Sequence, residues 1–225
     1  MRTKNLETVD KVRTRKTLFL LLSCLTLLLT PATLFADSTY SVSVDTSLLS
    51  GTSAQLAFDF IDGGSPSNTI TLSNFSTDAT LGINSPTGGV SGTLPGTVTL
   101  TDSSFFNEYL TNISLGTNFS FLLDATTNGP DPSSIPDAFS LLLFDPITGF
   151  PLFATTDPTG ANSLLTLNIN GSPTGALDVY IAPGGEAVAT VTPVVATPEP
   201  STLLMLGSGL ALVLSKRKGR GKQPT

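Results

Sequence analysis

The central part of this 225-residue chain contains no basic side chain. Residues 37 to 197 carry fourteen acidic side chains and no lysine, arginine or histidine, and the chain's only cysteine is Cys24. Without a cation, no salt bridge between side chains can form inside this block. Binding to a phosphate backbone needs Lys and Arg to neutralise charge, so nucleic acid is not an expected partner.

The same absences exclude most catalytic chemistry in residues 37 to 197. A block without histidine has neither a Ser-His-Asp triad nor a His-ligated zinc site. It also has no cysteine nucleophile, no lysine for a Schiff base and no arginine clamp for phosphate. We therefore expect this block not to be an enzyme. It also has no disulfide, but a domain of about this size buries roughly 70% of its unfolded surface and does not need one.

Carboxylates are the remaining source of chemistry. Asp59 and Asp62 are one candidate pair for acid–base work of the glycosidase kind, which needs carboxyl groups about 5 to 9.5 Å apart. The sequence expects no cofactor, with calcium as the alternative, because Ca²⁺ prefers oxygen ligands in loops. Its candidate ligands are Asp59 with Asp62, and Asp124 with Asn128 and Asp131. The competing interpretation is that these residues only stabilise turns.

The crowding of acidic groups predicts a pH dependence. Carboxylates close together without cations should have raised pKa values in the folded state. Stability should then be greatest below the unfolded pKa and should fall as the pH rises through the folded values.

Alternation of apolar and polar residues recurs from Asp37 to about Val195 and predicts short strands. The segments are TYSVSVD, LAFDF, TITL, TVTL, NFSFLLD, LLTLNIN and LDVYI. The pattern X-Pro-Thr-Gly at residues 85–88, 157–160 and 172–175, with a variant at 145–149, predicts turns. We therefore predict an all-β ectodomain over residues 37–195, an antiparallel β-sandwich or jelly-roll-like fold.

Two details of this fold can also be predicted. Phenylalanines at alternating positions should fill the space between the sheets, namely Phe58, Phe60, Phe119, Phe121, Phe139 and Phe144. The segment FFNEYLTNIS at residues 105–114 is the best candidate for a short helix or a bent strand.

Residues 1–36 have the pattern of a secretory signal peptide, which predicts export by the general secretion machinery. Basic residues precede an apolar run at 18–29, Pro31 ends that run, and the small Ala36 offers a cleavage site before Asp37. We expect this segment to be a helix that is removed from the mature chain.

The C-terminal segment, residues 196–225, has three parts in a fixed order. Pro198, Glu199 and Pro200 come first, and an uncharged run at 203–214 follows. A basic cluster at 216–222 ends it, made of Lys216, Arg217, Lys218, Arg220 and Lys222. We predict a short transmembrane helix at 201–215 with the basic cluster in the cytoplasm and the ectodomain outside. Twelve residues at about 1.5 Å each span roughly 18 Å, less than the ~30 Å hydrocarbon core. We therefore expect this helix to anchor the chain in the membrane only temporarily.

This tail resembles a PEP-CTERM sorting signal. Pro198, Glu199 and Pro200 match that motif, and Ser201 and Thr202 match its usual continuation. The resemblance implies processing by an exosortase, a membrane-embedded enzyme of Gram-negative bacteria that make exopolysaccharide. It implies a transient stay in the inner membrane, followed by release to the cell surface.

From this resemblance we expect a non-enzymatic protein of the cell surface or of the exopolysaccharide matrix of a biofilm. It would act structurally or by adhesion, with exopolysaccharide as a partner. The alternatives are a polysaccharide-binding or polysaccharide-cleaving extracellular domain, and an ordinary membrane-anchored protein. The body also resembles other β-rich proteins that carry the same tail, which implies no particular activity.

Overall fold

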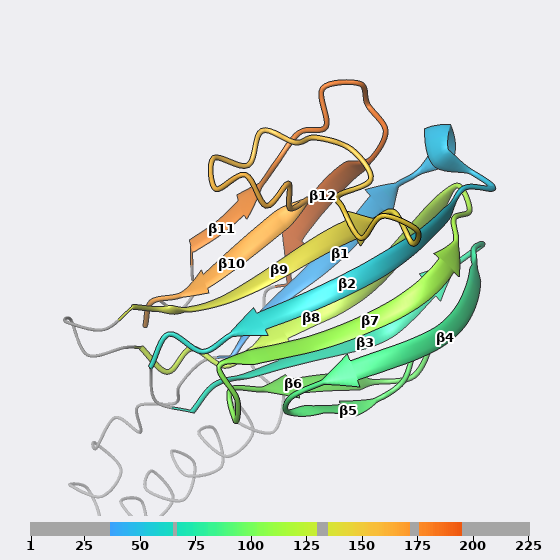
Figure 1. The fold of residues 1–225 in the computed structure, drawn as a ribbon. Coiled ribbons are helices and arrows are strands. Elements are labelled where there is room, and N and C mark those ends of the chain that lie inside the picture. The colour runs from blue at the N-terminus through green and yellow to red at the C-terminus, as the bar shows by residue number, and fades with distance from the viewer. Residues whose placement is uncertain (1–36, 65–66, 130–134, 172–175, 195–225) are drawn as a thin grey trace, which may run out of the picture. The chain divides into compact units, whose positions relative to one another are not determined.

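The computed structural model describes residues 37–64, 67–129, 135–171 and 176–194. These residues form two six-stranded antiparallel sheets (Figure 1). Sheet A has the strand order β12-β1-β8-β3-β6-β5, and sheet B has the order β11-β10-β9-β2-β7-β4. The prediction of an all-β, antiparallel fold is therefore confirmed. The predicted signal helix and transmembrane helix lie outside the described residues.

Every segment predicted from alternation overlaps one of the strands. Sheet A contains β1 (Ser38–Asp45), β3 (Thr69–Thr77), β5 (Val90–Gly92), β6 (Val98–Thr101), β8 (Asn118–Ala125) and β12 (Val188–Pro193). Sheet B contains β2 (Ser53–Ile61), β4 (Thr80–Thr87), β7 (Phe106–Ser114), β9 (Asp137–Phe144), β10 (Leu165–Ile169) and β11 (Ala176–Val179). The 3₁₀ helix η1 (Ser47–Leu49) lies between β1 and β2.

The first strands of the chain are paired in a nested way. β1 lies beside β8, β2 beside β7 and β3 beside β6, and the strands from β1 to β5 alternate between the sheets. The jelly-roll-like form of the sandwich stays a prediction. The last four strands widen both sheets on the same side, because β9, β10 and β11 extend sheet B beyond β2 and β12 extends sheet A beyond β1.

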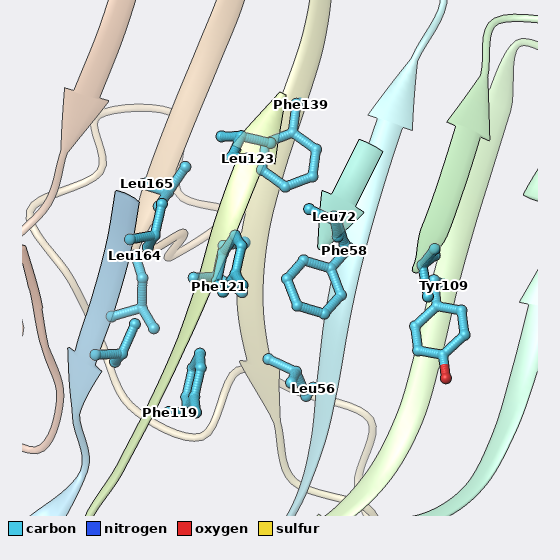
Figure 2. Packing of buried hydrophobic residues seen from close by; sticks show 14 of the residues in the cluster. Leu56, Phe58, Leu72, Tyr109, Phe119, Phe121, Leu123, Phe139, Leu164 and Leu165 are labelled. Carbon is cyan, nitrogen blue, oxygen red and sulfur yellow. The ribbon is translucent and has the colours of Figure 1, made fainter. Parts of the chain in front are cut away.

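Aromatic rings connect the two sheets through one core. Phe58 on β2 meets Phe121 on β8 edge-to-face, with ring centroids 5.3 Å apart, and stacks on Phe139 of β9 at 6.3 Å (Figure 2). Aromatic pairs at these separations add roughly 0.5–1.5 kcal/mol beyond the area they bury. Five of the six predicted core phenylalanines are buried as expected: Phe58, Phe60, Phe119, Phe121 and Phe139.

The sixth phenylalanine was predicted wrongly. Phe144 is the last residue of β9, is half-buried, and pairs in register with Gln55 on the face of sheet B that points away from sheet A. Three successive residues before it, Leu141, Leu142 and Leu143, are all buried. Alternation therefore cannot tell which side of the strand faces the core at this end.

The segment expected to be a short helix or a bent strand is a regular strand. β7 pairs with β2 over nine residues without a register shift. Its inward residues include Tyr109 and Ile113, which are buried in the core. Phe106 is the first residue of β7 and Phe105 precedes it, and both side chains are exposed.

A bulge in β3 keeps its aromatic residue inside. Ile70 and Leu72 point inward, but the next inward residue is Phe75 rather than residue 74. The register with β8 shifts between Ser73 and Ser76, and Asn74 there has a φ of 52°. Asn is one of the few residues that adopt this left-handed conformation readily, so it can supply the extra residue of a bulge.

Two of the predicted turns are confirmed. At 145–149 and 157–160 an Asp carboxylate accepts backbone N–H bonds from residues further along the turn, and each turn ends in a glycine with positive φ. At 85–88 the prediction was wrong, since Ser85 to Thr87 belong to β4 and the chain turns at Gly88 and Gly89. The fourth turn, at 172–175, lies outside the described residues.

Candidate functional site

The carboxyl groups of Asp59 and Glu108 form a pair on the outer face of sheet B, the face away from sheet A. Asp59 on β2 lies opposite Glu108 on β7, and their side chains hydrogen-bond to each other. Burial raises the pKa of Asp59 from 3.8 to about 7, helped by the charge of Glu108 and by the hydrogen bond between them. Burial also raises the pKa of Glu108. Near neutral pH the pair therefore shares a proton.

The surroundings explain why these two groups are desolvated. The neighbouring positions on this face are apolar on both sides of the pair: Ala57, Leu110 and Leu142 on one side, and Ile61, Phe106 and Ala138 on the other. Ala57 and Leu142 are buried even though they face outward. The Oδ1 atom of Asp59 is buried and has no hydrogen-bond partner in the described part of the protein. A charge on Asp59 is therefore poorly compensated.

The pair belongs to a polar row that crosses sheet B. The cross-strand register places six side chains in line on the outer face: Asp178, Thr166, Ser140, Asp59, Glu108 and Thr87. The sequence could not reveal this row, because its members come from six different strands. Only the pairing register brings them together.

The pair predicted from the sequence does not form. Asp62 lies beyond the end of β2, where its Oδ1 accepts a hydrogen bond from Gly64 N at 2.7 Å. Its own backbone N–H donates to Phe105 O at 3.0 Å. Asp62 thus stabilises a turn, while Asp59 is engaged with Glu108.

The residues proposed as calcium ligands also make structural hydrogen bonds. Asp124 Oδ1 accepts from Thr39 Oγ1 at 2.5 Å, and Asn128 N donates to Asn68 Oδ1 at 3.0 Å. Asp131 lies outside the described residues. Within residues 37–64, 67–129, 135–171 and 176–194, no three His, Cys, Asp or Glu side chains are grouped so that they could hold a metal ion.

A buried polar cluster that the sequence did not indicate joins loops at one end of the two sheets. Asp137, fully buried at the start of β9, accepts hydrogen bonds from Gly63 N and Asn68 Nδ2, each at 2.8 Å. Asn68 Nδ2 also donates to Asn128 O at 2.9 Å, and Asn68 N donates to Asp102 Oδ2 at 2.6 Å. These residues come from three separate loops and the start of β9, so no local pattern could have identified them.

The expectation of generally raised carboxyl pKa values was wrong for several residues. Hydrogen bonds from the hydroxyl and backbone N–H of Thr117 and from Asn118 N lower the pKa of Asp78 to about 2. Backbone N–H donors likewise lower the pKa of Asp45 and Asp145. Backbone N–H groups in turns thus stabilise these carboxylates in place of basic side chains. The count of charged residues in the sequence does not include such donors.

The sequence-predicted sorting and cleavage residues, from Ala36 and from Pro198 to Lys222, lie outside the described residues. A family model of the PEP-CTERM protein-sorting motif matches residues 196–218. The chain carries a PEP-CTERM motif. No curated protein and no solved structure matches the chain.

The PEP-CTERM match covers most of the predicted tail. It includes Pro198, Glu199 and Pro200 and extends to Lys218, so Arg220 and Lys222 lie beyond it. The motif implies exosortase-dependent sorting of an exported protein, with a membrane-anchor region at the C-terminus. In the described part of the chain, no helix has the length and apolarity to cross a membrane.

Proposed function

We propose that this protein is a non-enzymatic cell-surface or exopolysaccharide-matrix protein that acts structurally or by adhesion. The general secretion machinery exports it, the apolar tail holds it transiently in the inner membrane with its C-terminus in the cytoplasm, and an exosortase then processes the tail. The observation that carries this proposal is the PEP-CTERM motif at residues 196–218, which follows an acidic β-rich body on the same chain.

The construction of the body supports a structural role. Hydrogen bonds in the buried Asn68–Asp137 cluster tie its loops together, and its core crosses both sheets through Phe58 and Phe121. The fourteen carboxylates in residues 37–197 favour solubility outside the cell.

Mass spectrometry of the C-terminus in the native host tests the sorting step. We expect a wild-type chain that ends near Pro200 and is found outside the inner membrane. In a strain without the exosortase, the chain should keep residues 201–225 and stay in the membrane fraction. An intact tail on surface-exposed protein in the wild type would contradict the proposal.

A polysaccharide-binding role is the second candidate, and the Asp59–Glu108 pair favours it. A protonated carboxyl beside an ionised one can both donate to and accept from sugar hydroxyls. Their direct hydrogen bond places the two groups closer than the roughly 5 Å that a retaining glycosidase needs, so binding is favoured over cleavage. A glycan array measures polysaccharide binding, and a reducing-sugar assay measures polysaccharide cleavage, so together they distinguish the two activities. The combined Asp59→Asn and Glu108→Gln variant should lose binding, while Asp178→Asn, in the same row, should retain it.

A further inference from the structure

Each sheet ends in two edge strands, and they differ in how well they are protected. Such a strand presents unpaired N–H and C=O groups that can pair with another chain. Proteins prevent this with short strands, charges, prolines or bulges. The edges here are β12 and β5 in sheet A, and β11 and β4 in sheet B.

Three of the four edges have such protection. β5 is three residues long and ends at Gly92. β4 contains Pro86, and its register with β7 shifts between Leu81 and Asn84. β11 is four residues long and carries Asp178. Another strand would therefore pair poorly with any of them.

β12 lacks charges and bulges, and its only proline is its last residue, Pro193. Its six residues, VATVTP, carry no charge and pair with β1 without a register shift. Val194 N donates to Thr39 O at 2.8 Å, so every second residue before Val194 also directs its backbone groups at β1. The N–H and C=O groups of Ala189 and Val191 therefore point to the open side, where the described residues provide no strand.

We propose that β12 is a self-association edge, which pairs antiparallel with β12 of a second copy of this chain. An antiparallel strand pair has two-fold symmetry, so one uncharged strand is sufficient to build a closed dimer interface. The two copies of sheet A then become one continuous sheet. A second copy fits better than a basic partner, because β12 itself offers no carboxylate to a cation.

The sequence of β12 selects one register for this pair. In this register Ala189 of each copy lies opposite Val191 of the other copy, and each of these two residue pairs exchanges two backbone hydrogen bonds. Thr190 of one copy then lies opposite Thr190 of the other, on the outer face. An axis at Val191 would place Ala189 opposite Pro193, which has no N–H. An axis at Ala189 would place Val191 opposite Ala187, which precedes the strand. The Thr190 register is therefore the one that uses the whole edge.

The charge of the body makes this association dependent on salt. Residues 37–197 carry fourteen acidic groups and no basic one, so two copies repel each other. Salt shortens the range of that repulsion, to about 8 Å at 0.15 M. We expect the dimer to become more populated as the ionic strength rises, whereas binding of a basic partner would weaken.

Disulfide cross-linking of the full chain in its native envelope tests the pair and its register. Cys24 is the only cysteine, so a Cys24→Ser background leaves Thr190→Cys as the single thiol. In a close antiparallel pair the two Cα atoms are about 4.5 Å apart, which lies within the disulfide range of about 4.4–6.8 Å. Thr192→Cys is the matched control, because it is exposed on the same face. In the proposed register Thr192 lies opposite Val188 of the second copy, so the two Thr192 residues are four strand positions apart, roughly 13 Å.

We expect a dimer on non-reducing gels for Thr190→Cys, stronger at high salt, and none for Thr192→Cys. Adding Ala189→Pro should abolish the dimer, since it removes an outward N–H but no hydrogen bond to β1. The melting temperature of this variant should stay close to that of wild type. Monomer only for Thr190→Cys, equal cross-linking of both thiols, or cross-linking to a different protein would each overturn the proposal.

Discussion

The Asp59–Glu108 pair should make the protein less stable at neutral pH than at mildly acidic pH. The pKa of Asp59 rises from 3.8 to about 7 on folding, mainly because the group is buried. The folded protein therefore holds this proton more tightly than the unfolded chain does. Its stabilising effect is complete below the unfolded pKa, near 4, and is lost as the pH rises through about 7.

The size of the effect follows from the pKa difference. One pKa unit corresponds to about 1.4 kcal/mol, and Asp59 is partly exposed, so the loss between pH 4.5 and pH 8 should be about 3 kcal/mol. For a domain of this size, 1 kcal/mol shifts the melting temperature by roughly 2–4 °C. The wild-type melting temperature should therefore fall by about 6–12 °C over this pH range.

Asp59→Asn tests the assignment, because the amide cannot ionise but can still donate to Glu108. Followed by circular dichroism, the variant should melt roughly 6–12 °C above wild type at pH 8, and close to wild type at pH 4.5. Asp178→Asn removes one charge from the same row without touching the pair, and should show little of this gain. A wild-type melting temperature that is flat or rises from pH 4.5 to pH 8, or equal gains for the two variants, would refute the reasoning.

Three further predictions concern other parts of the chain. Asn68→Ala removes a donor from the buried Asp137 and should lower the unfolding free energy by about 3 kcal/mol in urea titrations; an unchanged midpoint would contradict the cluster's role. Asp78→Ala should lower the melting temperature at pH 7, because turn amides hold the pKa of Asp78 near 2; this difference should disappear as the pH falls from about 4 through 2. Denatured protein digested with trypsin should yield residues 37–197 without an internal cut, and a tryptic peptide ending inside this block would show that the charge count is wrong.

The sequence by itself determined the fold class, most of the strands and the sorting tail. Alternation is a local property, so β1, β2, β8 and β10 could be predicted from a few consecutive residues each. Turns such as 157–160 depend on one Asp, one Pro and one Gly, so they could also be predicted from a few consecutive residues. The Pro-Glu-Pro motif, the apolar run and the basic cluster are also contiguous, which is why the tail could be recognised without any structure.

Only the tertiary structure decided which carboxylates meet. Asp59 was predicted to act with Asp62, three residues away, but cross-strand register brings it to Glu108, 49 positions further along the chain. The same register places Phe144 on the outer face and leaves β12 as the edge without protection. Register is set by the packing of the whole core, because a shift of one residue would exchange the two faces of a strand. No short stretch of sequence contains that information.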